Sequence, residues 1–239
     1  MPLPQLDNTI PKYYMTIPTT KEEVKFRPFL VGEQKTLLVA FESKDERQIL
    51  TSMLDCLSNC VPNVNLKTLS TFDVDYMFTK VRAKSVGETT NVVHSCRECT
   101  TENKITLNLD DIKVDTSGFN DKTIVDISND ISIELQYPSY MDVIKNESFY
   151  DDKANQADVL MSSIKTVMKS VRTQDENILI KDEPKEEVDK FINSLTNAQL
   201  EKITSFAQNA PALTHTHTYE CVKCKTENEV TFRGLQDFF

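Results

Sequence analysis

Four of the six cysteines in this sequence form two Cys-x-x-Cys pairs, Cys96 with Cys99 and Cys221 with Cys224. In a reducing compartment this spacing favours a metal ion over disulfides. Four thiolates satisfy a tetrahedral zinc ion at about 2.3 Å per bond and leave no open coordination position, so a site of this kind stabilises structure. We therefore expect one structural zinc ion, held jointly by the four cysteines.

The two pairs stand in repeated surroundings. A Thr-Glu-Asn tripeptide follows each pair, at 101–103 and at 226–228, and an alternating segment comes next, at 104–109 and at 229–232. Alternation of apolar and polar residues is typical of strands. Each half therefore predicts a strand that enters a tight knuckle and a second strand that leaves it, and two facing knuckles form a zinc ribbon.

Other interpretations of the metal-binding residue types stay open. The long separation of the pairs allows two independent reduced pairs, whereas a thioredoxin-like redox site fits poorly because neither pair opens a helix after a strand. A histidine could replace a cysteine, but we expect His94, His215 and His217 to point away from the metal or to pack beside a shell that four cysteines complete. Cys56 and Cys60 have helical spacing and are expected in the core.

Charge and hydropathy narrow the class of protein. The 239 residues include 27 Lys and Arg against 37 Asp and Glu, a net charge of −10, which weakens any nucleic-acid-binding hypothesis. The longest apolar run, 37–41, is far shorter than the roughly 18 residues of a membrane helix. The N-terminus lacks the features of a signal peptide. We expect a soluble cytoplasmic protein with no membrane partner.

Several further elements must position the knuckles. Residues 13–17 and 23–27 alternate and predict a hairpin, and helices are expected from 32 to 41, from 46 through 57 and over 73–85. After the first knuckle, 123–127 and 131–137 predict a second hairpin, turned at 129–130. Helices then follow over 155–171, 185–194 and 198–208, with a strand-like segment at 178–180.

These elements predict an α+β fold in which β-hairpins and a split zinc ribbon combine with helices, including a helical insertion between the knuckles. We expect a single domain over 1–239. Its sub-regions are the hairpin and helices (1–92), the first knuckle and β-hairpins (93–138), the helical insertion (139–210) and the second knuckle with the C-terminal tail (211–239).

The sequence contains no catalytic constellation. A Gly-rich phosphate loop, a nucleophile elbow and a His-Glu-x-x-His motif are all missing. A closed zinc shell offers no Lewis-acid chemistry either. We therefore expect a protein that is not an enzyme and has no small-molecule substrate.

Several segments together resemble the baseplate proteins of T4-like contractile-tailed bacteriophages. They are Phe26-Arg27-Pro28-Phe29-Leu30-Val31 with Glu33 and Lys35-Thr36-Leu37-Leu38, Phe72-Asp73-Val74-Asp75-Tyr76 running to Arg82-Ala83-Lys84-Ser85-Val86-Gly87-Glu88, Pro211-Ala212-Leu213, the second knuckle, and Gly234-Leu235-Gln236-Asp237-Phe238-Phe239. The resemblance spans nearly the whole chain.

The resemblance implies a role in building the central hub of the tail baseplate, either as a hub subunit or as an assembly chaperone. The implied partners are other baseplate hub proteins, and the implied location is the host cytoplasm during assembly or the baseplate of the finished virion. A zinc-ribbon accessory factor that binds phage nucleic acid is the alternative from another class, although neither knuckle carries a basic surface.

Two segments are candidate anchors for partner proteins. Arg27 and Phe29 flank a proline, and this pairing of a guanidinium with an aromatic ring is common at interface hot spots. The alternative is that Phe29 joins the hairpin to the first helix and Arg27 pairs with a nearby acid. The terminal Phe238 and Phe239 must be buried either in the protein's own core or in a partner's groove.

Overall fold

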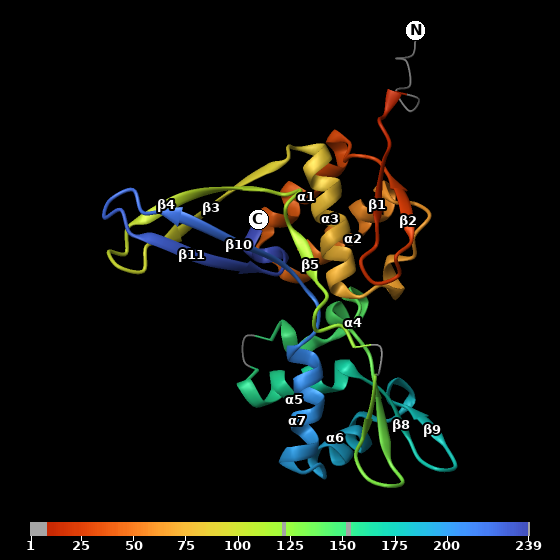
Figure 1. The fold of residues 1–239 in the computed structure, drawn as a ribbon. Coiled ribbons are helices and arrows are strands. Elements are labelled where there is room, and N and C mark those ends of the chain that lie inside the picture. The colour runs from red at the N-terminus through yellow and green to blue at the C-terminus, as the bar shows by residue number, and fades with distance from the viewer. Residues whose placement is uncertain (1–8, 121–122, 152–153, 239) are drawn as a thin grey trace. The chain divides into compact units, whose positions relative to one another are not determined.

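The computed structural model describes residues 9–120, 123–151 and 154–238, and it combines helices with small antiparallel sheets (Figure 1). The predicted α+β class is confirmed. The chain divides into two compact units, Met1–Thr116 with Pro211–Phe239 and Ser117–Ala210. Within the described ranges, no helix has both the length and the apolar character needed to cross a membrane.

The first unit begins with the predicted hairpin and the three predicted helices. Their bounds are β1 (Tyr13–Thr16), β2 (Glu23–Phe26), α1 (Val31–Ser43), α2 (Glu46–Cys60) and α3 (Thr71–Ser85), with a short helix η2 (Leu66–Thr68) between the last two. Asp45 starts α2, because its side chain accepts a hydrogen bond from the backbone N–H of Gln48. Helix α3 is buried on most of its surface and packs against α2, β5 and β10. It is therefore the central helix of this unit.

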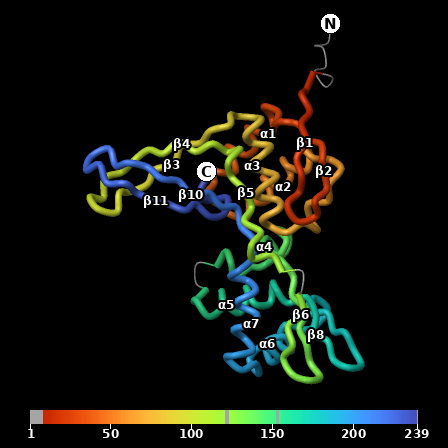
Figure 2. The backbone as a smooth tube through the Cα atoms, viewed as in Figure 1, coloured from red at the N-terminus to blue at the C-terminus, as the bar shows by residue number. Residues whose placement is uncertain are grey.

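Two long hairpins complete the first unit and carry the knuckles. They are β3 (Thr89–Ser95) with β4 (Glu102–Asn108) and β10 (Ala212–Glu220) with β11 (Glu227–Arg233), and β5 (Lys113–Asp115) adds a third strand beside β10. Figure 2 shows these hairpins side by side although they lie far apart in the sequence. One face of each hairpin enters a shared core with the end of the chain, η5 (Leu235–Phe238).

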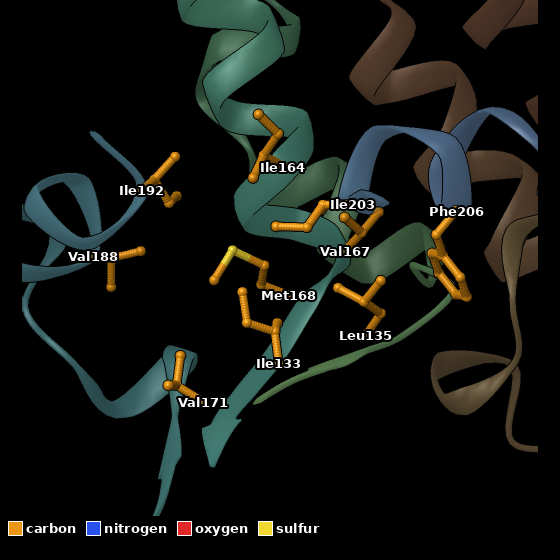
Figure 3. Close-up of a cluster of buried hydrophobic side chains, with 10 residues drawn as sticks. All are labelled: Ile133, Leu135, Ile164, Val167, Met168, Val171, Val188, Ile192, Ile203 and Phe206. Atoms are coloured by element: carbon orange, nitrogen blue, oxygen red, sulfur yellow. The ribbon is translucent and has the colours of Figure 1, made fainter. Parts of the chain in front are cut away.

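The second unit is the insertion between the knuckles. Its elements are β6 (Ile124–Asp126), β7 (Ser132–Leu135), α4 (Tyr140–Lys145), η3 (Glu147–Phe149), α5 (Gln156–Val167), β8 (Met168–Arg172), β9 (Asn177–Leu179), η4 (Ile180–Asp182), α6 (Lys185–Asn193) and α7 (Asn197–Gln208). Four of these strands form one sheet in the order β6-β7-β8-β9. The sheet and helices α5, α6 and α7 enclose a separate apolar core (Figure 3).

Two boundaries differ from those that the sequence predicts. The helix expected over 155–171 ends at Val167, because Met168–Arg172 pairs with β7 and forms a strand instead. The insertion begins at Ser117 and not at 139, because β7 of the second hairpin pairs with β8. That hairpin therefore lies in the second compact unit, together with the strand that it pairs with.

The start and the end of the inserted unit approach each other closely at Gly118. A Cβ atom at this position would lie 1.9 Å from the backbone oxygen of Asn209, a distance that no side chain tolerates. Glycine is required here because only a residue without a Cβ allows the two backbones to meet. The contact brings together the first and the last residues of the inserted unit.

Candidate metal centre

The two knuckles bring the four predicted cysteine ligands together. The Sγ atoms of Cys96 and Cys224 are 3.6 Å apart, as are those of Cys99 and Cys221, and all four sulfurs lie within 4.8 Å of one another. Sulfurs bound tetrahedrally to one zinc ion would lie about 3.8 Å apart, given Zn–S bonds of about 2.3 Å. The separations are too long for disulfides, so all four are free thiols. The cluster has the ligand type, number and spacing of a closed metal site.

The backbone of each knuckle has the same conformation. In the first, the N–H of Cys96 donates to the carbonyl of Thr101 and the N–H of Thr100 donates back to Cys96, both at 2.9 Å. The second knuckle repeats this pattern at Cys221. Thr100 and Lys225 occupy the same position in the two turns and have φ angles of 56° and 62°. The repeated sequence therefore folds into two copies of one turn, which aim their sulfurs at a common point.

Asn103 ties the first knuckle to the second. Its side chain is buried, and its Oδ1 accepts a 2.9 Å hydrogen bond from the backbone N–H of Val222. Its Nδ2 donates to the carbonyl of Thr101 at 2.7 Å and points to the sulfur of Cys221 at 3.8 Å. One amide thus fixes its own turn and orients a ligand of the other pair.

Asn228 makes the reciprocal contacts from the second knuckle. Its Oδ1 accepts from the N–H of Arg97 at 3.1 Å, and its Nδ2 donates to the carbonyl of Thr226 and to the sulfur of Cys96 at 3.5 Å. The two knuckles are therefore related by an approximate twofold exchange. The recurring Thr-Glu-Asn tripeptide was visible in the sequence, but the role of its asparagine becomes clear only when the knuckles face each other.

Hydrogen bonds prepare two of the thiols for metal binding. The backbone N–H of Cys224, with that of Lys223, lowers the pKa of Cys221 to about 6, in spite of the opposing effect of desolvation. The equivalent N–H of Cys99 lowers the pKa of Cys96 in the same way. With a pKa of about 6, Cys221 is largely ionised at neutral pH. The thiolate is the form that binds a metal, so this residue needs to lose no proton when an ion binds.

The histidines lie outside the cluster. Among the described residues, the group that could hold an ion at this place consists of the four cysteines alone. His94 packs beside it, with its Nδ1 2.9 Å from the hydroxyl of Tyr219. His215 and His217 follow each other along one face of β10, with ring centroids 6.0 Å apart. Among the described residues, the three histidines therefore lie outside the group of potential ligands, as the sequence predicts.

A second group of potential ligands, Glu33 with Cys56 and Cys60, has a different character. Both thiols are buried as predicted, and the guanidinium of Arg27 binds the carboxylate at 2.6 and 2.8 Å. Hydrogen bonding to Cys56, together with burial, raises the pKa of Cys60, which keeps this thiol protonated. Arg27 already supplies the positive charge here, so this cluster is an ion pair packed against two buried thiols.

The candidate partner anchors have contacts within the chain. Phe238 is fully buried, its ring centroid is 5.9 Å from that of Phe232, and its carbonyl accepts a hydrogen bond from Thr90. Of the two alternatives that the sequence left open, it therefore follows burial in the protein's own core. Its ring is buried because it completes the apolar core between the two hairpins. Phe239 lies outside the described residues.

Arg27 and Phe29 follow the alternative that the sequence left open. Arg27 pairs with Glu33, while the ring of Phe29 packs 5.7 Å from that of Phe78 and its N–H donates to Ser85. These contacts join the end of the first hairpin to α1 and α3. A role for either residue in binding a partner stays a prediction.

Comparison with known proteins identifies one family. The model of the family described as T4 bacteriophage base plate protein matches residues 10–239, nearly the whole chain. No curated protein and no solved structure matches the chain.

Proposed function

We propose that this chain, which belongs to the family of T4 bacteriophage base plate proteins, is a non-enzymatic protein that helps to assemble the central hub of the tail baseplate. Membership in the family gives the role in the phage tail baseplate, and it is the observation that carries the proposal. The hub is the finer step, and it is supported by the resemblance of segments such as 26–31 and 234–239 to hub components and hub assembly factors. Its partners are other baseplate proteins.

The electrostatics of the chain support a role based on protein contacts. Three carboxylates whose pKa is shifted from its ordinary value bind partners within the chain. They are Glu33 with Arg27, Asp73 with Thr19, and Glu134 with Lys169 and Arg172. The knuckle surface has mixed charge, since Lys225 lies 3.2 Å from Glu220. Such a surface suits protein partners better than a phosphate backbone.

The four-cysteine cluster is proposed to hold one structural zinc ion. When bound, the ion supplies a cross-link between two distant parts of the chain. The chain's own residues orient and support the ligands: the knuckle turns aim the sulfurs, backbone N–H groups lower the pKa of Cys96 and of Cys221, and the two asparagines hold the knuckles in register. A rigid hairpin pair is a suitable scaffold for an assembly surface.

Metal analysis of the purified protein tests the site. We expect one zinc per chain in the wild type and none when Cys221→Ser is combined with Cys224→Ser. Cys56→Ser combined with Cys60→Ser is the matched control and should retain the metal. Zinc missing from the wild type, or full occupancy in the first double variant, would contradict the shared site.

Deletion of the gene tests the assembly role. We expect lysates of the deletion phage to lack complete hubs and to regain them when the wild-type gene is supplied in trans, as seen by electron microscopy of tail precursors. Affinity capture of the tagged chain should recover other baseplate proteins. Normal baseplates without the gene would refute the proposal. Mass spectrometry of purified virions then distinguishes a hub subunit from an assembly chaperone.

A further inference from the structure

Helix α1 exposes apolar side chains on the face that points away from the rest of its unit. Val31, Leu38 and Phe41 are 84%, 56% and 47% exposed, whereas Leu37 and Ala40 are buried. The three exposed positions follow a spacing of seven and three residues, so they form one stripe along the helix. We call Val31, Leu38 and Phe41 the α1 stripe.

This stripe is unusual for the outer face of a surface helix. Such a face normally carries polar residues, and contiguous exposed apolar patches mark places where another molecule binds. The neighbouring Val39 is also exposed, which widens the apolar surface. The helix itself packs mainly on α2 through its other side. The α1 stripe therefore has the properties of an interface.

The charges beside the stripe indicate which molecule covers it. Lys35 and Glu42 are both exposed and lie on the same edge of the stripe, seven residues and almost two helical turns apart. Neither takes part in any ion pair formed by the described residues. The edge of the stripe thus carries a positive charge near one end and a negative charge near the other.

We propose that α1 binds α1 of a second copy of this chain in an antiparallel helix pair. Reversing the second helix places its Glu42 opposite Lys35 of the first, and the twofold symmetry of the pair forms the same contact again at the other end. A parallel pair would instead place like charges near each other. Leu38 and Phe41 of the two copies pack together between the two ion pairs, with Leu38 next to the twofold axis, and Val31 lies beyond Lys35 at each end.

The expected dimer is weak. A single pair of short helices buries an area at the low end of specific interfaces, so we expect a Kd on the order of 10 μM. Electrostatic complementarity of this kind fixes the register and orientation of the partner. This inference does not depend on the role in hub assembly, because the dimer forms from the purified chain alone.

Sedimentation velocity of the full chain, over about 1 to 300 μM, tests the inference. We expect a reversible monomer–dimer equilibrium that Leu38→Asp abolishes. Lys35→Glu and Glu42→Lys should each raise the Kd at least about tenfold, because each replaces two attractive contacts with two repulsive ones. Lys67→Glu, an equal charge change at an exposed position outside α1, is the control and should leave the Kd unchanged.

The decisive sample is an equimolar mixture of Lys35→Glu and Glu42→Lys. An antiparallel pair made of one copy of each has attractive contacts at both ends, so the mixture should recover dimers that neither variant forms alone. Melting curves of every variant should match that of the wild type, because these side chains are exposed. A wild-type chain that is monomeric throughout would overturn the inference, as would a mixture that does not recover. If the chain stays monomeric and Leu38→Asp loses another baseplate protein, the α1 stripe belongs to that protein and the inference also fails.

Discussion

The asparagines that follow the cysteine pairs contact the opposite knuckle of the candidate metal centre. Asn103 and Asn228 are each 2% exposed, and each satisfies a backbone N–H of the opposite knuckle while donating toward one of its sulfurs. A buried N–H without such a partner would cost about 1–3 kcal/mol. These side chains therefore hold the two halves of the site in register as well as supporting the ligands.

Replacing either asparagine should weaken metal binding without removing a ligand. We expect Asn103→Ala or Asn228→Ala to lower the zinc affinity about 10- to 100-fold, the usual effect of removing a hydrogen-bond partner of a metal ligand. Competition with a chromogenic chelator measures this. Asn91→Ala, on the exposed face of β3, is the control and should leave the affinity unchanged. An undiminished affinity in both variants would show that the knuckles align without these amides.

The sequence predicts the residues of this centre unequally. The four cysteines follow from their types and spacing, because a tetrahedral thiolate site needs little else. Phe238 could not be placed in the same way, since the choice between its own core and a partner's groove depends on the space left between Leu107 and Phe232. That space exists only once two segments far apart in the sequence, β4 and β11, have packed together.

At the scale of elements, one buried carboxylate connects the first hairpin to the central helix. Asp73, in the first turn of α3, accepts hydrogen bonds from the backbone N–H of Thr19 at 3.1 Å and from its hydroxyl at 2.5 Å. Burial raises the pKa of Asp73 above 3.8, even though both bonds from Thr19 oppose the shift. The folded state therefore binds this proton more tightly than the unfolded state. The stability that follows is complete below pH 3.8 and is lost as the pH rises through the folded pKa.

An uncharged side chain of the same shape should remove that loss. Asp73→Asn keeps an acceptor for the N–H of Thr19 and can donate to its hydroxyl, so we expect a melting temperature at about pH 7 that equals or exceeds that of the wild type. The advantage should shrink as the pH falls toward 3.8. Calorimetry across this range measures it, with the exposed Asp55→Asn as control. A clear destabilisation at neutral pH would mean that the hydrogen bonds require the charge.

The C-terminal element η5 contributes one buried side chain, Phe238, to the core of the first unit. Its ring lies in the core formed by the two long hairpins. We expect Phe238→Ala to lower the free energy of unfolding by about 3–5 kcal/mol, as for other buried phenylalanines. Denaturant titration measures the effect, with the exposed Gln236→Ala as control. A loss below about 1 kcal/mol would indicate that the core closes without this ring.

The sequence predicts an element correctly where the signal is local. The prediction is wrong where pairing with a distant strand determines the structure. The hairpin β1–β2 and helices α1 to α3 occur close to their predicted bounds, because alternation, capping residues and apolar faces are local signals. Residues 168–171 continue a helical pattern in sequence, yet Val171 pairs with Ile133 and forms a strand. This is a tertiary contact that overrides local propensity.

At the scale of the whole molecule, the two units have separate cores, and the cysteine cluster lies in only one of them. The cysteine cluster brings Cys99 beside Cys221, 122 residues away in the sequence, and both belong to the first unit. The apolar core around Ile133 and Ile203 is made only of residues from the inserted unit. A zinc ion at the knuckles is therefore coupled directly to the folding of the first unit and not to that of the second.

Chelation of zinc from the full chain should therefore loosen one unit selectively. We expect backbone amides of β3, β4, β10 and β11 to lose protection from hydrogen exchange, because these hairpins depend on the ion for their register. Amides of β7 and β8 should keep their protection, since their core remains intact. Exchange measured by mass spectrometry at one pH, with and without chelator, tests this. Cys221→Ser combined with Cys224→Ser should reproduce the pattern without any chelator. Equal loss in both units would show that the molecule unfolds as one cooperative body, and no loss at all would show that the hairpins stand without a metal.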